Sequence, residues 1–193
     1  MEKFSEFEFR TQPWFDQSKH QKFNHVIPLK TIVIHCFDPR ATEIPQAVAK
    51  HFGDEVYPGE NILDEAGNRV GSTRTIFTLT NAGGRAHGAL QSIAAMDYLF
   101  DYQNAVVVHH SFCGNTALTP EDLINKFRDQ YHADISPLFD HDSLSIPHFE
   151  DSIKHDIKLL RSSPAVPKHL KLYGFFYEID SGKLTEVARD IPA

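Results

Sequence analysis

The stretch TIVIHCFDPR, residues 31–40, decides the fold class that this sequence predicts. Its first four residues form an uninterrupted β-branched run, as in a strand that is covered on both faces of a sheet. A second expected strand at 75–80 stops at Asn-Ala-Gly-Gly, residues 81–84, and a third at 106–108 stops at His-His, residues 109–110. Because ligand sites of parallel sheets form outside the carboxyl ends of the strands, we expect the functional side chains at this edge.

Helical patterns separate these strands. Thr119, followed by a proline and two acidic residues, predicts a helix start. A further strand and an edge strand flank the turn at 180–183. The alternation predicts an α/β fold, a mainly parallel central β-sheet flanked by helices with an antiparallel C-terminal edge strand. The other expected helices cover 41–52, 86–100 and 149–160.

The chain divides into two parts. Residues 1–28 scatter aromatic residues among charges before the first strand, and we expect a partly helical N-terminal arm that packs on the core or on a second subunit. Residues 29–193 have the length of a single α/β domain. Within it, the glycine-containing and proline-containing segment 57–74 is expected to be a surface insertion.

Composition limits the class of partner. The formal net charge of −7 disfavours nucleic acid and anionic membranes. No apolar stretch approaches the ~20 residues of a membrane span, and the first ten residues are too acidic for a signal peptide. We therefore expect a cytoplasmic protein that binds neither nucleic acid nor membrane. Its two cysteines should stay reduced, which leaves metal binding, catalysis or plain burial.

The two cysteines fall where the sheet would present a site. Cys36 follows the first strand, and His110 with Cys113 follows the third. A His-x-x-Cys pair and one further thiolate form a Cys₂His set that suits Zn²⁺ and leaves the fourth tetrahedral position open. We expect one Zn²⁺ per chain. The alternative is that both cysteines are simply buried as small hydrophobic residues.

Neighbouring residues strengthen the metal interpretation. Asp38 and Arg40 place a carboxylate and a guanidinium directly behind Cys36. Gly83 and Gly84 offer backbone N–H groups ahead of a helix, which favours an anion or polar substrate. The alternative for Asp38 and Arg40 is a loop salt bridge with little energetic value.

Taken in order, Cys-x-Asp-x-Arg, Asn-Ala-Gly-Gly and His-His-x-x-Cys-Gly resemble the motifs of the β-class carbonic anhydrases. The resemblance spans roughly residues 30–190, and the short chain is similar to the compact branch that also contains carbonyl sulfide hydrolases. It implies that Cys36, His110 and Cys113 are the zinc ligands, that Asp38 and Arg40 form the catalytic dyad, and that the chain assembles as a homodimer or tetramer.

The resemblance implies reversible hydration of CO₂ to bicarbonate by a zinc-bound hydroxide. Asp38 would orient the zinc-bound water and Arg40 would hold Asp38 ionised, although in this family the aspartate can instead close the fourth zinc position. The alternative activity is hydrolysis of carbonyl sulfide, or carbon disulfide, with release of H₂S on the same zinc site. A non-catalytic zinc or redox protein is the third interpretation.

Three departures from the family pattern stand out. The insertion lengthens the interval between the first two ligands, Thr80 replaces an arginine, and Phe112 replaces a small or acidic residue. The last change leaves the choice between CO₂ and carbonyl sulfide open. Candidate pocket residues are Phe37, Phe77 and Phe112, for which core packing is the alternative, and His87, a candidate proton relay.

His35 and His109 stand beside ligands in the sequence, but side chains alternate between the two faces of a strand. We therefore expect both to be buried structural histidines.

Overall fold

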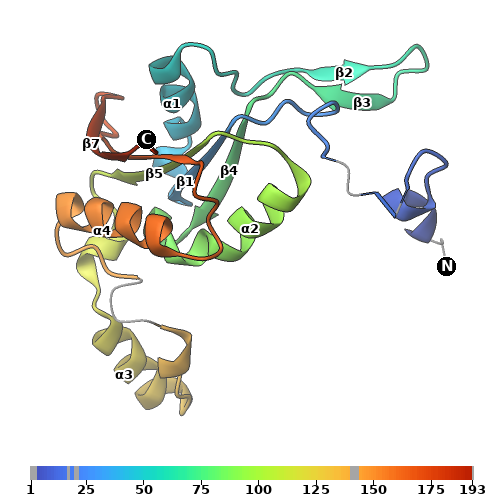
Figure 1. The fold of residues 1–193 in the computed structure, drawn as a ribbon. Coiled ribbons are helices and arrows are strands. Elements are labelled where there is room, and N and C mark those ends of the chain that lie inside the picture. The colour runs from blue at the N-terminus through green and yellow to red at the C-terminus, as the bar shows by residue number, and fades with distance from the viewer. Residues whose placement is uncertain (1–3, 17, 20–21, 140–143, 193) are drawn as a thin grey trace.

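A five-stranded sheet forms the centre of the molecule in the computed structural model, which describes residues 4–16, 18–19, 22–139 and 144–192 (Figure 1). Its strand order is β4-β1-β5-β6-β7. The first four strands in this order run parallel, and β7 pairs antiparallel with β6, which confirms the predicted fold class. The strands are β1 (Thr31–Cys36), β4 (Ile76–Asn81), β5 (Asn104–His110), β6 (Lys171–Tyr177) and β7 (Leu184–Asp190).

Helices cover both faces of this sheet. On one face α1 (Ile44–Phe52) packs against Val33 of β1 and Val106 of β5. On the other face lie α2 (Leu90–Leu99) and α4 (Phe149–Ser162), against alternate residues of the same strands. Because side chains alternate along a strand, a continuous β-branched run such as β1 can supply both cores. All six residues of β1 are buried, which is what the sequence pattern predicted.

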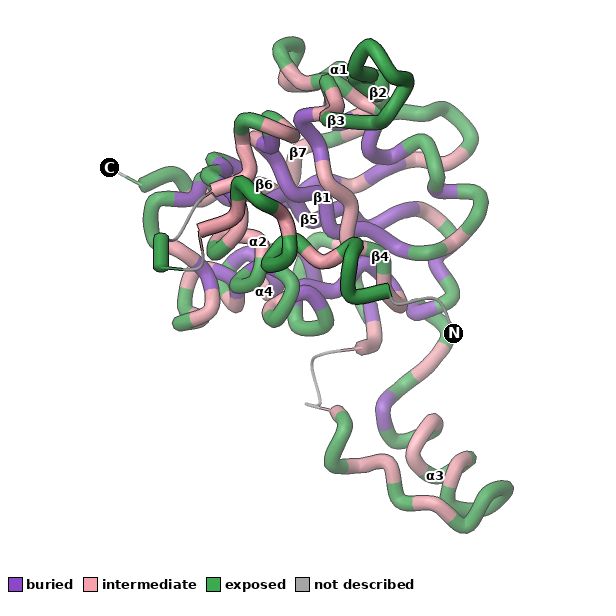
Figure 2. The backbone as a smooth tube through the Cα atoms, turned by 90° about the vertical axis from the view of Figure 1, so that its right-hand side faces the viewer, coloured by how far each residue is buried: buried purple, intermediate pink, exposed green. Residues whose placement is uncertain are grey.

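Helix α3 (Pro120–Tyr131) stands away from the sheet (Figures 1 and 2). Its start is the predicted one, since the Thr119 hydroxyl accepts a hydrogen bond from the backbone N–H of Asp122 at 3.1 Å. Its hydrophobic residues are only half-buried, or exposed in the case of Tyr131. The amphipathic pattern therefore located the helix, but not its position outside the main core.

Segment 57–74 contains a two-stranded antiparallel sheet, β2 (Asn61–Leu63) and β3 (Arg69–Ser72). Figure 1 shows this hairpin projecting from the body of the molecule. Among the described residues, no helix combines the length and the apolar character that a membrane span requires.

The N-terminal arm leaves large aromatic surfaces uncovered. It contains two short 3₁₀ helices, Phe4–Phe7 and Phe9–Thr11, and ends at the core through Phe23. The Phe9 and Phe23 rings stack with centroids 5.0 Å apart, and the Phe23 and Phe100 rings lie 6.3 Å apart. The exposed fractions of the uncovered side chains are 73% for Phe4, 75% for Phe7, 58% for Phe9 and 50% for Trp14.

Deletion of residues 1–16 should weaken self-association, because these exposed rings need a partner surface to leave water. Phe23 remains in the truncated chain, so its contact with Phe100 is preserved. Light scattering over a dilution series should show a lower molar mass for the truncated protein than for the full chain. Identical molar masses at every concentration would contradict a role for the arm between subunits.

Candidate metal centre

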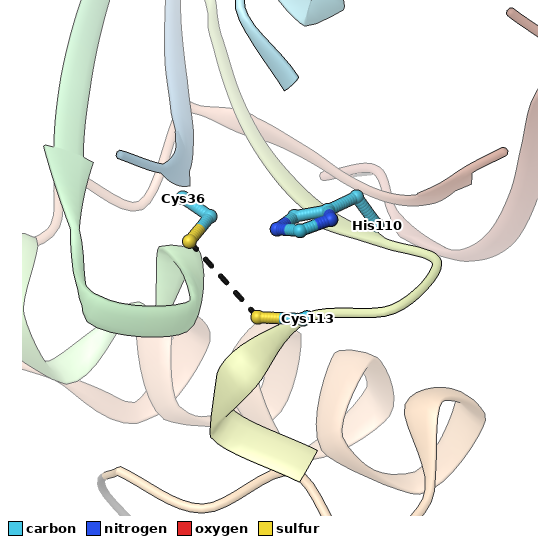
Figure 3. A group of neighbouring side chains, drawn as sticks. All are labelled: Cys36, His110 and Cys113. Atoms are coloured by element: carbon cyan, nitrogen blue, oxygen red, sulfur yellow. Dashed lines mark hydrogen bonds between the residues drawn. The ribbon is translucent and has the colours of Figure 1, made fainter. Parts of the chain in front are cut away.

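Three side chains that could ligate a metal meet at the carboxyl edge of the sheet (Figure 3). Cys36 ends β1, His110 ends β5, and Cys113 follows in the loop before the short 3₁₀ helix Gly114–Ala117. Their ligand atoms all lie within 4.8 Å of one another, and the two sulfur atoms are 4.0 Å apart. All three residues are buried. The structure thus brings together the three residues that the sequence placed in one site.

This arrangement fits a zinc-type ion. Two thiolates bound to tetrahedral Zn²⁺ at ~2.3 Å would lie about 3.8 Å apart, close to the observed separation. The Nδ1 of His110 is 2.9 Å from the carbonyl oxygen of Ser111, which can only accept, so Nδ1 carries the proton. The buried Nε2 has no hydrogen-bond partner among the described residues. The Nε2 atom of His110 therefore has a lone pair that could bind a metal ion. Figure 3 shows the imidazole beside the two sulfur atoms.

The two thiols differ in acidity. The Cys113 thiol donates to the Cys36 sulfur and lowers the pKa of Cys36 below its usual range, with smaller contributions from the imidazole of His110 and the N–H groups of Asp38 and Gly83. The same contact, together with burial, raises the pKa of Cys113. A divalent cation between the sulfur atoms would favour the thiolate form of both.

Asp38 and Arg40 form a bidentate ion pair beside Cys36. Arg40 Nε lies 3.0 Å from one carboxylate oxygen of Asp38, and Nη2 lies 2.7 Å from the other. The hydrogen bonds from Arg40 lower the pKa of Asp38 to about 2. The same Nη2 donates to the carbonyl oxygen of Phe112 at 3.1 Å. Arg40 therefore links the loop that follows Cys36 to the loop that carries Cys113.

The glycines of segment 81–84 serve a close approach to Cys36. Gly84 has a φ of +66°, and a Cβ there would lie 2.8 Å from the backbone nitrogen of Cys36. Gly83 has a φ of +71°, and its Cβ would lie 2.9 Å from the side-chain nitrogen of Asn115. Only glycine avoids both the strain and the clash. Gly84 thus allows this segment to pack closely against β1, and Gly83 allows it to pack closely against Asn115.

Phe37 and Phe112 lie next to ligands in the chain and are 66% and 71% exposed. Phe112 also has a φ of +56°, a left-handed conformation that disfavours residues with a Cβ by roughly 1–2 kcal/mol. Phe77 packs against Phe100 instead, with ring centroids 5.3 Å apart. It lies four residues before the end of β4, which is about 13 Å along the strand. The structure does not bring Phe77 to the cysteines.

Exposed His87 lines a separate small cavity with Asn81 and Leu138, and it does not join the ligand group. His35 and His109 are buried, as strand alternation predicted. The Nδ1 atom of His35 lies 2.9 Å from the carbonyl oxygen of Cys36.

One buried group behind the site was not anticipated from the sequence. Asp156 of α4 is 1% exposed and contacts the side chains of Arg85 and His109. Its position offered a signal, since Asp156 falls between Ile153 and Ile157 on the buried face of the amphipathic helix. A carboxylate at such a position is rarely buried without partners.

Known proteins with similar sequences include carbonic anhydrases. No family model matches the chain. "Beta-carbonic anhydrase 1" of Mycobacterium tuberculosis is 26% identical over 98 residues, which are 51% of this chain and 58% of that protein. The match thus spans little more than half the length of this relative. YvdA of Bacillus subtilis, provisionally named a carbonic anhydrase, is 23% identical over 167 residues, covering 82% of this chain and 76% of YvdA.

Solved structures agree on the fold. A carbonic anhydrase of Streptococcus mutans superposes with a TM-score of 0.61 at 23% identity, covering 97% of this chain and 99% of that one. A carbon disulfide hydrolase superposes with a TM-score of 0.58 at 18% identity, covering 82% and 78%. Fold and site together describe a mainly parallel α/β protein with a buried Cys-His-Cys group that could hold a metal ion. In sequence and in fold the chain is similar to β-carbonic anhydrases.

The variants Cys36→Ser, His110→Ala and Cys113→Ser should each contain less zinc than the parent, because two remaining ligands chelate weakly. Elemental analysis of the purified proteins measures the zinc content per chain. His25→Ala, which removes an exposed histidine, is the matched control and should keep the parent's zinc. Full zinc occupancy in any of the three ligand variants would refute the assignment of that residue.

Proposed function

We propose that this protein catalyses the reversible hydration of CO₂ to bicarbonate with one zinc ion per chain. The observation that carries the proposal is a buried group of three candidate ligands among the described residues, Cys36, His110 and Cys113, with the Asp38–Arg40 pair in the loop after Cys36. A structural zinc site normally has four protein ligands, whereas a catalytic one has three and an open position. Zinc bound here would act as a Lewis acid that makes water nucleophilic near neutral pH.

Each neighbouring residue has a defined task in this proposal. Asp38, whose pKa is lowered to about 2 by Arg40, stays ionised at neutral pH and can accept a hydrogen bond from the attacking water. Arg40 fixes the direction of that carboxylate through its two hydrogen bonds. Ser111 fixes the ring of His110 through its carbonyl oxygen. These contacts orient the nucleophile before substrate arrives, which is how positioned hydrogen bonds contribute to catalysis.

The alternative candidate is hydrolysis of carbonyl sulfide or carbon disulfide at the same site. Phe112 supports it, because this residue stands between two ligands and is held in a strained conformation with its ring exposed. An apolar ring there disfavours a hydrated anion such as bicarbonate more than a small neutral gas. The structural similarity to a carbon disulfide hydrolase concerns the fold only.

The zinc-loaded parent should hydrate CO₂ in a stopped-flow indicator assay. Asp38→Asn and Arg40→Ala should retain zinc but lose turnover by about 10–100-fold, as is typical when partners of a metal site are removed. Arg128→Ala, which disrupts the exposed ion pair between Arg128 of α3 and Asp134 in the following loop, is the matched control. Parent-like turnover in both dyad variants would remove Asp38 and Arg40 from the mechanism.

Substrate choice is tested at Phe112. Phe112→Gly and Phe112→Asp both tolerate the left-handed backbone, so they should fold and keep zinc. We expect the ratio of carbonyl sulfide to CO₂ turnover to fall by about an order of magnitude, the scale of a few methylene groups in a pocket wall. Tyr131→Ala removes an exposed ring on α3 and should leave this ratio unchanged. Variants that are folded, zinc-loaded and parent-like in this ratio would exclude Phe112 from selectivity.

A further inference from the structure

The carboxylate of Asp156 is the centre of a buried polar network beneath the metal centre. Arg85 donates to it from Nε at 3.0 Å and from Nη2 at 3.0 Å, and the backbone N–H of Ala86 donates at 3.2 Å. The Nε2 atom of His109 lies 3.3 Å from the same carboxylate. The side chains of Arg85, His109 and Asp156 are at most 4% exposed. This ion pair is therefore buried, unlike the solvent-exposed pairs on a protein surface, and breaking it by removing one partner should be costly.

One branch of this network leads to Cys36. Arg85 directly follows Gly84, whose backbone packs against the backbone of Cys36. The side chain of Asn81 closes the segment 81–85, because it accepts from the backbone N–H of Arg85 at 2.8 Å and donates to its carbonyl oxygen at 2.9 Å. A shift of Arg85 would therefore move the groups that hold the first cysteine.

The other branch leads to His110. His109 precedes this ligand in β5, and alternation along the strand directs the two rings to opposite faces. The ring of His109 contacts α4 through Asp156, while the ring of His110 lies at the metal centre. The contact with Asp156 thus fixes the end of β5 from the side opposite to the ion.

We propose that Asp156, with Arg85 and His109, positions the metal ligands Cys36 and His110, and that this network sets the zinc affinity and geometry of the centre. The network acts through the backbone of two ligand-bearing segments and contacts neither substrate nor metal. This inference rests on the proposed zinc site and adds to it a positioning group on α4, far from all three ligands in the sequence.

A purely structural role makes a different prediction. Replacing a buried ion pair by apolar residues of similar volume is often neutral or stabilising, because both desolvation costs disappear together. If Arg85 and Asp156 only filled the core, the double variant Arg85→Met/Asp156→Leu would preserve the metal centre, although it would lower stability because the Ala86 N–H and His109 lose their acceptor. A positioning role requires that the fold survives while the metal centre changes.

The test compares this double variant with the parent in three measurements. Thermal unfolding reports the fold, competition with a chromophoric chelator reports zinc affinity, and the visible spectrum of the Co²⁺-substituted protein reports ligand geometry. We expect a folded protein whose zinc affinity is lower by about 10–100-fold and whose Co²⁺ spectrum is shifted. The control Thr31→Val/Asn104→Leu removes a buried polar pair at the opposite end of β1 and β5, and should leave affinity and spectrum unchanged. A folded double variant with the parent's affinity and spectrum would overturn the proposal.

If the double variant does not fold, single variants at His109 test whether the network positions the metal ligands. His109→Gln keeps a side-chain nitrogen for Asp156 and should retain the parent's zinc affinity, whereas His109→Leu removes the contact and should lose affinity. Equal affinities in the two folded variants would refute positioning through His109. If the parent itself binds no zinc, the proposed function fails; a parent that binds zinc while all variants match it refutes only the positioning network.

Discussion

The parallel pairing of β1 with β5 is the constraint on which the rest of the structure depends. His35 is paired with Val108, so the two strands end at nearly the same level, and their last residues include Cys36 and His110. Both strands are buried along their whole length. A shift of one residue in a strand turns every side chain to the other face, so core packing on both sides fixes the register. The relative position of the two ligands is therefore set by the hydrophobic core.

Burial then determines what this edge can hold. Two thiols within 4.0 Å in a buried position cannot both ionise easily without a cation, and the opposite pKa shifts of Cys36 and Cys113 express this. A divalent ion bound by two thiolates and a neutral imidazole leaves no net charge on the group. By charge, a site of two thiolates and a neutral imidazole favours a dication, and the 4.0 Å between the sulfur atoms suits ions that bind thiolates at ~2.3 Å.

The sequence predicted those parts of the site that follow from local pattern. Strand ends are visible in a β-branched run such as Thr31–Ile34, and the motifs around Cys36 and Cys113 predict a set of candidate ligands without knowledge of distances. Contacts between elements that are far apart in the sequence could not be predicted from local pattern. The partnership of Arg85 with Asp156 joins positions that are 71 residues apart, and no periodicity in either segment announces it. For Phe77 the structure favours the core-packing alternative, because a strand pattern does not show how far a residue lies from the end of the strand.

Phe112 lies in a loop, whereas Cys36 and His110 lie at the ends of buried strands. Cys36 and His110 end buried strands and are held by the core, by the close approach of Gly84 and by the network around Asp156. Phe112 lies in the loop between His110 and Cys113, where its backbone is left-handed and its carbonyl oxygen accepts a hydrogen bond from Arg40. A change of its side chain therefore disturbs few contacts, whereas a change at a ligand or beneath it disturbs the sheet. Differences in substrate among proteins with this metal centre are physically cheapest at such loop positions, because the chemistry of the ion is preserved while the wall of the pocket changes.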